Sequence, residues 1–297
     1  MGCADVIPGV SGGTVAFIAN IYEELIHSIK SIDLVSLRLL SKYKFAEFWG
    51  HINGNFLFAV FLGIATSLLS LSKLMTYLLK QYPISIWSFF FGLILMSSPI
   101  ILKDIKKRNV TTWISLLLGA VIAYLITVAT PRETPDNLWF IFFCGSLAIC
   151  AMILPGISGA FILLLIGKYE FMINSLIEMR LDVIIVFILG AFIGLVLFSH
   201  FLSWILIHFR NSTLGALAGF MIGSLNKVWP WKEVISYRLT DSGIQIPALD
   251  KNILPGRYME IYHQDPNILY AVLFLSLGIF AVILIEKIAQ YKKIKSR

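Results

Sequence analysis

The sequence predicts an all-α polytopic membrane protein built from two inverted-topology repeats, each a broken, re-entrant helical hairpin followed by three transmembrane helices. Three observations support this fold class: an apolar composition, long apolar runs, and a short phrase that occurs twice. Of the 297 residues, 58% are hydrophobic and 14% are charged, whereas soluble domains average about 45–50% and about 25%. The runs are continuous, which disfavours a transmembrane barrel with its alternating pattern.

Apolar runs close to the roughly 20 residues that cross a bilayer recur along the whole chain. The predicted spans are 54–79, 84–102, 111–129, 183–207, 214–229 and 267–286. Two further apolar segments, 4–28 and 138–167, are each interrupted by proline and glycine. The polar link 230–266 is expected to be an external loop, and the last residues, 287–297, a basic tail.

The charged links predict the topology. Basic residues gather in 29–52, in "KDIKKR" at 103–108 and in the tail 287–297, and such links are normally cytoplasmic. The link 131–137, with one arginine and two acids, is expected outside. The alternating crossings agree with these sides only if segment 138–167 begins and ends outside and segment 4–28 begins and ends inside. Both termini are therefore predicted to be cytoplasmic, and the net charge of +7 needs no nucleic-acid partner.

Both interrupted segments carry the same phrase, "DVIPGVSGGT" at 5–14 and "MILPGISGAF" at 152–161. At an offset of 147 residues, Pro8 matches Pro155 and Ser11 matches Ser158; later glycines match at an offset of 127. The chain thus divides into repeat 1, residues 1–129, and repeat 2, residues 138–286. Three crossings per repeat give opposite orientations, as in many secondary transporters.

Only seven residues precede Pro8, against about 15 apolar residues before Pro155. Because the repeats otherwise correspond, we expect part of the first hairpin to lie upstream of this sequence. The second phrase also has Ala160 and Phe161 where the first has Gly13 and Thr14. The two copies of the phrase are therefore not expected to be equivalent.

Interrupted backbone at membrane depth is tolerated only where it is buried in protein or lines a cavity. After the proline, a new half-helix begins with unpaired N–H groups, which together with serine hydroxyls make a cradle for an anion such as phosphate. The alternative is a kink that only lets helices pack closely. The candidate phosphate-binding residues are Pro8, Gly9, Ser11, Gly12, Gly13, Thr14, Pro155, Gly156, Ser158 and Gly159.

Four further polar residues occupy matched positions in apolar segments. Lys73 and His200 are candidate charge sites or side chains that reach to the interface, and Glu23 and Glu170 are candidate proton carriers or loop caps. Coupling to a proton or sodium gradient is plausible on this basis. The three cysteines lack metal-ligand spacing, so neither a metal site nor a cofactor is expected, and no catalytic residue is assigned.

The stretch "ADVIPGVSGGTVAFIANIYEELI" resembles the signature of the bacterial polyprenyl-phosphate transporter family, formerly a domain of unknown function, and "LPGISGAFILLLIGKYE" resembles its internal repeat. The resemblance covers essentially the whole chain. It implies a flippase in the bacterial cytoplasmic (inner) membrane that returns undecaprenyl phosphate from the outer to the cytoplasmic leaflet for cell-envelope polymer synthesis. Polyprenyl-phosphate lipid and membrane lipids are the implied partners.

Two other functions were weighed against a lipid transporter. A transporter or channel for a small soluble anion would use the same cradles, but it would need no lateral opening for a lipid tail. A membrane phosphatase acting on polyprenyl pyrophosphate is less favoured, because Gly12 and Gly159 follow the serines where such enzymes carry arginine. The sequence therefore predicts a transporter and not an enzyme.

Overall fold

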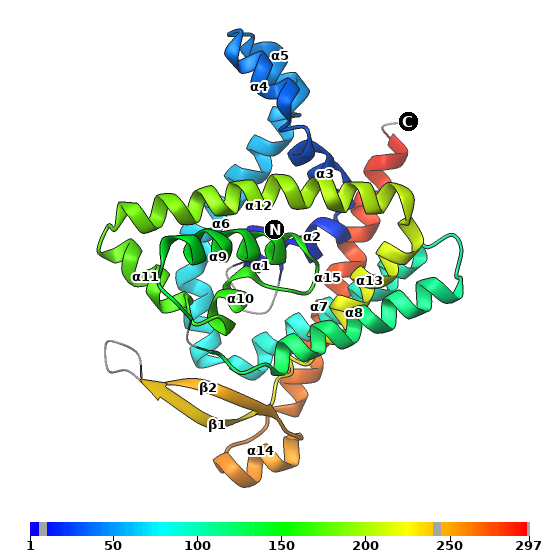
Figure 1. Ribbon diagram of the computed structural model, residues 1–297. Coiled ribbons are helices and arrows are strands. Elements are labelled where there is room, and N and C mark those ends of the chain that lie inside the picture. Colours follow the sequence, from blue (N-terminus) through cyan, green and yellow to red (C-terminus); the bar gives the residue numbers. More distant parts are fainter. Residues whose placement is uncertain (6–10, 133, 240–244, 296–297) are drawn as a thin grey trace.

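The computed structural model describes residues 1–5, 11–132, 134–239 and 245–295 (Figure 1). Within these residues, five helices are long and apolar enough to cross a membrane. They are α6 Gly54–Gln81, α7 Pro83–Lys103, α8 Val110–Val128, α12 Leu181–His208 and α15 Ile268–Lys295. Each overlaps a predicted span. The chain is thus an α-helical, multi-pass membrane protein.

Two helix bounds differ from those expected. The predicted span 214–229 is replaced by α13, Arg210–Ser224, with 15 residues. It begins earlier because its polar first turn is satisfied locally: the Thr213 hydroxyl donates to the Phe209 carbonyl over 3.0 Å. Helix α15 continues through most of the predicted tail, as far as Lys295. Polar residues at a helix end hide its true limits from a hydropathy pattern.

Each interrupted segment contains three helices. The first has α1 Gly2–Asp5, α2 Gly12–Ile18 and α3 Tyr22–Lys30. The second has α9 Leu138–Ile153, α10 Gly159–Leu165 and α11 Tyr169–Ile177. The helices of the two segments therefore extend beyond the predicted bounds 4–28 and 138–167, as far as Lys30 and Ile177. Beyond the break at the Pro-Gly phrase, the chain bends again, by 106° between α10 and α11.

The turns that end α2 and α10 have the same backbone geometry. Asn20 and Gly167, 147 residues apart, both have left-handed conformations, with φ of 57° and 66°. In both copies the next residue donates back to the carbonyl five positions earlier, over 3.0 Å in the first and 2.8 Å in the second. The similarity of the two segments thus extends from their sequence to their hydrogen bonds.

The later helices pack across the two halves through close glycine contacts. A Cβ at Gly92 of α7 would lie 2.2 Å from the carbonyl oxygen of Leu275 in α15. A Cβ at Gly219 of α13 would lie 2.1 Å from the carbonyl oxygen of Leu116 in α8. Gly219 is the repeat mate of Gly92. Small residues let these helix backbones approach closely.

The glycines on the partner helices, α15 and α8, make corresponding contacts in the opposite direction. A Cβ at Gly278 would meet the Phe89 carbonyl oxygen at 2.1 Å, and one at Gly119 would meet that of Ala216 at 2.4 Å. Exchanging the halves therefore converts the α7–α15 contact into the α13–α8 contact. This correspondence is what a two-fold arrangement of repeats requires; the inverted orientation of the two halves stays a prediction.

Helices α1, α2, α9 and α10 lie in the middle of the view, between α12 and α8, whereas α4, α5 and α14 lie at the ends of the molecule (Figure 1). α2 contacts α7, α9 and α15, while α12 packs along α9 and α3. Buried side chains from the first segment, α7, α12 and α13 form one core cluster, which includes Ile18, Tyr22, Ile94 and Met221. The described residues at the breaks, such as Ser11 and Ile157, are thus buried in protein, as membrane depth demands.

The predicted loop 230–266 contains regular structure. β1 Lys232–Leu239 pairs antiparallel with β2 Gln245–Asn252, and α14 Pro255–Tyr262 follows. This hairpin lies at the opposite end of the molecule from α4 Leu34–Ser41, α5 Phe45–His51 and the C-terminus (Figure 1). Links predicted on opposite sides of the membrane therefore lie at opposite ends. Which end is cytoplasmic stays a prediction.

Candidate functional site

The two interruptions meet in the interior. Ser11, the N-cap of α2, is 1% exposed. Its hydroxyl oxygen lies 3.0 Å from the carbonyl oxygens of both Met152 and Leu154 and accepts from Gly13 N at 3.1 Å. The last carbonyls of a helix lack partners within it, so a serine of the first segment satisfies the end of α9 in the second.

A second hydrogen bond joins the same two places. Gly156 N donates to the hydroxyl oxygen of Thr14 over 3.1 Å, and Thr14 is fully buried. Gly156 has φ of +86°, and a Cβ there would lie 2.9 Å from Met221 Cα. A Cβ at Gly13 would lie 2.3 Å from the Ile153 carbonyl oxygen. A larger residue at Gly13 would therefore force the two segments apart, whereas one at Gly156 would collide with α13. We call this contact the junction; it comprises Ser11, Gly13, Thr14, 152–154 and Gly156.

The matching residues of the second phrase lie differently. Ser158 is buried but makes no capping bond to α10 among the described residues. A Cβ at Gly159 would lie 2.4 Å from the carbonyl oxygen of Ala148, within the same hairpin. Pro155 is also buried. The two phrases thus contact each other directly, mainly through side chains of the first phrase. That they form two cradles for one anion stays a prediction.

The phosphate-binding role of the phrase residues stays a prediction. The Gly12, Gly13 and Thr14 backbone opens α2, and all three residues are buried. The hydroxyls of Ser11 and Thr14 are buried and have backbone partners. Pro8 and Gly9 lie outside the described residues.

The candidate charge sites are distributed over four helices. Glu23 of α3 pairs with Arg210, the first residue of α13, at 2.6 Å. Glu170 lies in the first turn of α11. Lys73 is exposed on α6, and His200 Nδ1 lies 2.9 Å from the carbonyl oxygen of Val196 in its own helix, α12. Their role in coupling stays a prediction.

Two buried polar residues near the segments escaped the sequence reading. Lys168, 3% exposed, donates to the Thr134 carbonyl at 2.5 Å and pairs with Asp136. The Tyr22 hydroxyl is buried without a hydrogen-bond partner among the described residues. The sequence signal for Lys168 was its position directly after the glycine of an apolar segment. The signal for Tyr22 was the repeated Tyr-Glu pair.

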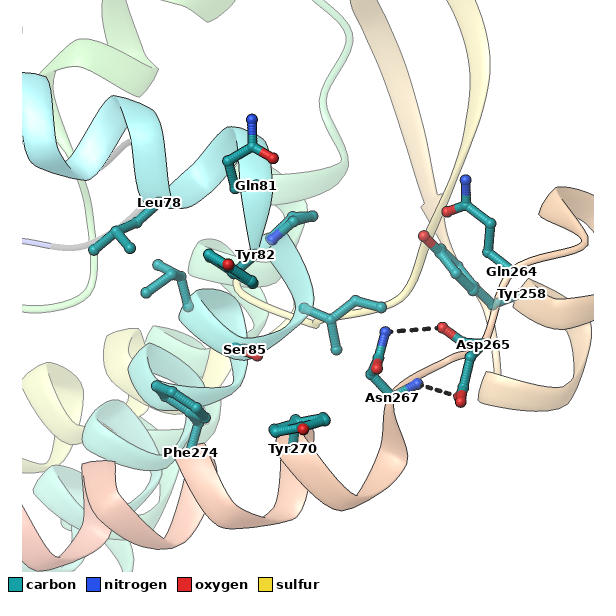
Figure 2. Close-up of a pocket in the computed structure, with 13 residues that line it drawn as sticks. Leu78, Gln81, Tyr82, Ser85, Tyr258, Gln264, Asp265, Asn267, Tyr270 and Phe274 are labelled. Carbon is teal, nitrogen blue, oxygen red and sulfur yellow. Dashed lines mark hydrogen bonds between the residues drawn. The ribbon is translucent and has the colours of Figure 1, made fainter.

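A pocket of about 680 Å³ opens where α6 turns into α7, beside the start of α15 (Figure 2). Leu78 and Phe274 form apolar parts of its wall, and Tyr82, Tyr258 and Tyr270 bring aromatic rings with hydroxyls. We call it the tyrosine pocket. Its walls join helices of both predicted halves, so it lies where a ligand could enter between them.

Interrupted helices that meet inside a bundle of membrane helices define a class of protein: a polytopic membrane protein with discontinuous helices, a feature that many secondary transporters share. The sequence profile of the undecaprenyl phosphate translocase-like family matches residues 1–246. The chain therefore belongs to this family.

Two curated relatives carry the name polyprenyl-phosphate transporter. One, from Vibrio cholerae serotype O1, is 44% identical over 290 residues, which cover 98% of this chain and 94% of the relative. The other, from Staphylococcus aureus, is 33% identical over 248 residues, or 77% of this chain and 83% of the relative. No solved structure gives a significant match.

Proposed function

We propose that this protein transports polyprenyl phosphate, and in particular undecaprenyl phosphate, from the outer to the cytoplasmic leaflet of the bacterial cytoplasmic membrane. Both termini would then be cytoplasmic, and the returned carrier would serve envelope polymer synthesis. Family membership and the names of the two relatives support the substrate. The structural observation that carries the proposal is the buried junction between the two interruptions.

The junction contains hydrogen-bond donors whose bonds a phosphate oxygen could accept. Its bonds join neutral partners: the Ser11 hydroxyl to the end of α9, and Gly156 N to the Thr14 hydroxyl. Rocking of one half against the other would release these donors. A phosphate oxygen would then take their place, and hydrogen bonds to an ionised group are about twice as strong as neutral ones. The phosphate head group would thus form new hydrogen bonds in place of those that the two segments lose when the junction opens.

The tail of the lipid would remain in the membrane. The tyrosine pocket offers an apolar wall at Leu78 and Phe274 with polar tips at its rim (Figure 2), a combination suited to the boundary between lipid and water. A soluble anion would need no such opening between helices. This pocket therefore favours a lipid over the alternative of a small soluble anion.

Transport against a gradient of the lipid would need an energy source, and a proton or sodium gradient is the proposed one. Glu23, Glu170 and His200 are the candidate carriers, with Lys73 as an additional charge site. Reconstituted vesicles with an imposed proton or sodium gradient test this step. The initial rate of lipid translocation should depend on one of the two gradients.

The direction of transport is tested in cells by surface labelling of undecaprenyl phosphate. Depletion of this protein should enlarge the outward-facing pool, and re-expression should restore it. An unchanged pool in cells without another such transporter would overturn the proposal. Uptake of inorganic phosphate by vesicles that fail to translocate the lipid would favour a soluble-anion transporter, and phosphate release from polyprenyl pyrophosphate would indicate an enzyme.

A further inference from the structure

A second cavity, of about 610 Å³, lies between the end of α8, α10 and the β-hairpin. Lys227, three residues after α13, and Lys232, the first residue of β1, both line it. Their side chains are only 20% and 16% exposed. We call it the lysine cavity. Lysines are rarely buried to this extent unless they are paired.

The two lysines share one carboxylate. Asp250 Oδ2 lies 2.9 Å from Lys232 Nζ, and Asp250 Oδ1 lies 3.3 Å from Lys227 Nζ. Lys251 also contributes to the lining, but it is exposed and lies opposite Glu233 in the hairpin. The partly buried cluster therefore holds two positive groups and one negative group. One formal positive charge of this cluster is therefore left without a compensating carboxylate among the described lining residues.

The charged side chains of the cavity wall lose part of their hydration because they are partly buried. Burial lowers the pKa of Lys232, although Asp250 partly opposes this. Burial acts to raise the pKa of Asp250, yet this pKa is below its usual value because the two lysines outweigh the effect. An anion that entered would restore favourable interactions to the lysines, since nearby opposite charge favours their charged form.

Aromatic rings fix the two ammonium groups. Lys227 Nζ lies 4.8 Å from the centroid of the Phe161 ring on α10, and Lys232 Nζ lies 5.3 Å from that of Trp87 on α7. Phe161 belongs to the second phrase, and the end of α13 reaches from the cavity to the junction, where Ser224 Oγ lies beside Gly156. The lysine cavity and the junction are thus neighbours.

From this arrangement we propose that the lysine cavity is an anion-binding site for a phosphomonoester, where Lys227 and Lys232 hold the phosphate before it reaches the junction. A phosphate monoester carries a charge of about −1.5 to −2 near neutral pH, which is opposite in sign to the excess charge of the cluster and can interact with both lysines. That the phosphomonoester is a lipid head group rests on the proposed function; that the cavity binds a phosphate does not.

The decisive measurement is binding to the purified full chain, by titration calorimetry in detergent for inorganic phosphate and in nanodiscs for polyprenyl phosphate. Replacing both lysines, Lys227→Met and Lys232→Met, should weaken binding of each probe by about tenfold or more, because charge-assisted hydrogen bonds are lost. Lys44→Met is the matched control, since this exposed lysine lies far from the cavity in the sequence and pairs with Glu47 at 2.7 Å. Unchanged affinity in the folded double variant would overturn the proposal.

A second variant has the opposite expected effect. Asp250→Asn removes the competing carboxylate, so phosphate should bind several-fold more tightly and with a steeper dependence on salt. Lysines that serve only to anchor the hairpin predict a lower melting temperature with no gain in affinity, which would refute the site. Because this variant keeps both lysines, it decides the matter even where the double variant fails to fold.

The two proposals can fail separately. Tight binding of inorganic phosphate that depends on both lysines, without binding or translocation of the lipid, supports the site and refutes the lipid as substrate. Translocation of polyprenyl phosphate that is unaffected in the folded double variant, with unchanged phosphate affinity, supports the proposed function and refutes the site.

Discussion

The two interrupted segments share a phrase and a backbone geometry but differ in what they contact. In the first, Ser11 and Thr14 make hydrogen bonds to the second half of the chain. In the second, Ser158 makes no capping bond among the described residues, and Phe161 replaces Thr14 and lies under Lys227. The repeated phrase thus marks a helix break in both segments. At the junction the first copy supplies hydroxyl groups and the second supplies backbone groups, and Phe161 of the second copy also lines the lysine cavity.

A similar difference separates α6 and α12, which occupy matched positions and each contain 28 residues. A Cβ at Gly190 of α12 would lie 2.0 Å from the Phe142 carbonyl oxygen of α9. At its mate Gly63 in α6, no described atom lies within 4 Å. Equivalent glycines therefore have opposite surroundings, which provides matched controls for substitutions at the junction.

The largest effect is expected at Gly13. Gly13→Ala would place a methyl group 2.3 Å from the Ile153 carbonyl oxygen, and the backbone must shift to relieve it, at a cost of about 1–3 kcal/mol or more. Thermal and denaturant unfolding of the purified protein measure this loss. Gly63→Ala is the control, and it should be neutral or stabilise by up to about 1 kcal/mol through helix propensity. Equal effects of the two changes would contradict a tight junction.

Thr14→Val should follow in size. The change keeps the shape of the side chain but leaves the buried Gly156 N–H without its acceptor, which costs about 1–3 kcal/mol. The loss is read from the unfolding free energy, and hydrogen exchange at Gly156 should become faster. Thr76→Val is matched to it, because the exposed Thr76 hydroxyl donates only within its own helix; a loss there as large as at Thr14 would argue against the junction.

The serines of the two phrases should differ in their contribution. Ser11→Ala removes the N-cap acceptor for Gly13 N and the donor to the end of α9, with a cost of about 1–2 kcal/mol. Ser158→Ala should cost less than about 0.5 kcal/mol, since Ser158 caps nothing in the described part of the chain. Both are measured by unfolding under identical conditions. A larger loss at Ser158 would reverse the assignment of the two copies.

The smallest effect is expected from the ion pair between Glu23 and Arg210, which links α3 to α13. Both side chains are about half exposed, at 53% and 42%, so the coupling energy should be no more than about 1 kcal/mol and should fall with added salt. A double-mutant cycle with Glu23→Gln and Arg210→Gln measures it. A coupling that is large and independent of salt would show that the pair is more deeply enclosed than its exposure indicates.

Local features of the sequence were sufficient for the fold class and for the sites of interruption. Long apolar runs predict α6, α7, α8, α12 and α15, because a helix that crosses lipid must be apolar along its length. The Pro-Gly phrase predicts where the helices break, since proline removes a donor and glycine permits left-handed backbone. The β-hairpin and the ends of α13 were missed because polar residues there follow no membrane pattern.

What each polar group contacts was decided only by the tertiary structure. Ser11 meets Met152, Glu23 meets Arg210, and Lys227 meets Asp250, across 141, 187 and 23 positions of sequence. A hydroxyl or an ammonium can pair with many partners of similar chemistry, and the choice depends on which backbones approach within about 3 Å. That approach is set by helix packing at glycines in both halves. The sequence therefore determined where the helices break, and the packing determined which groups contact the broken ends.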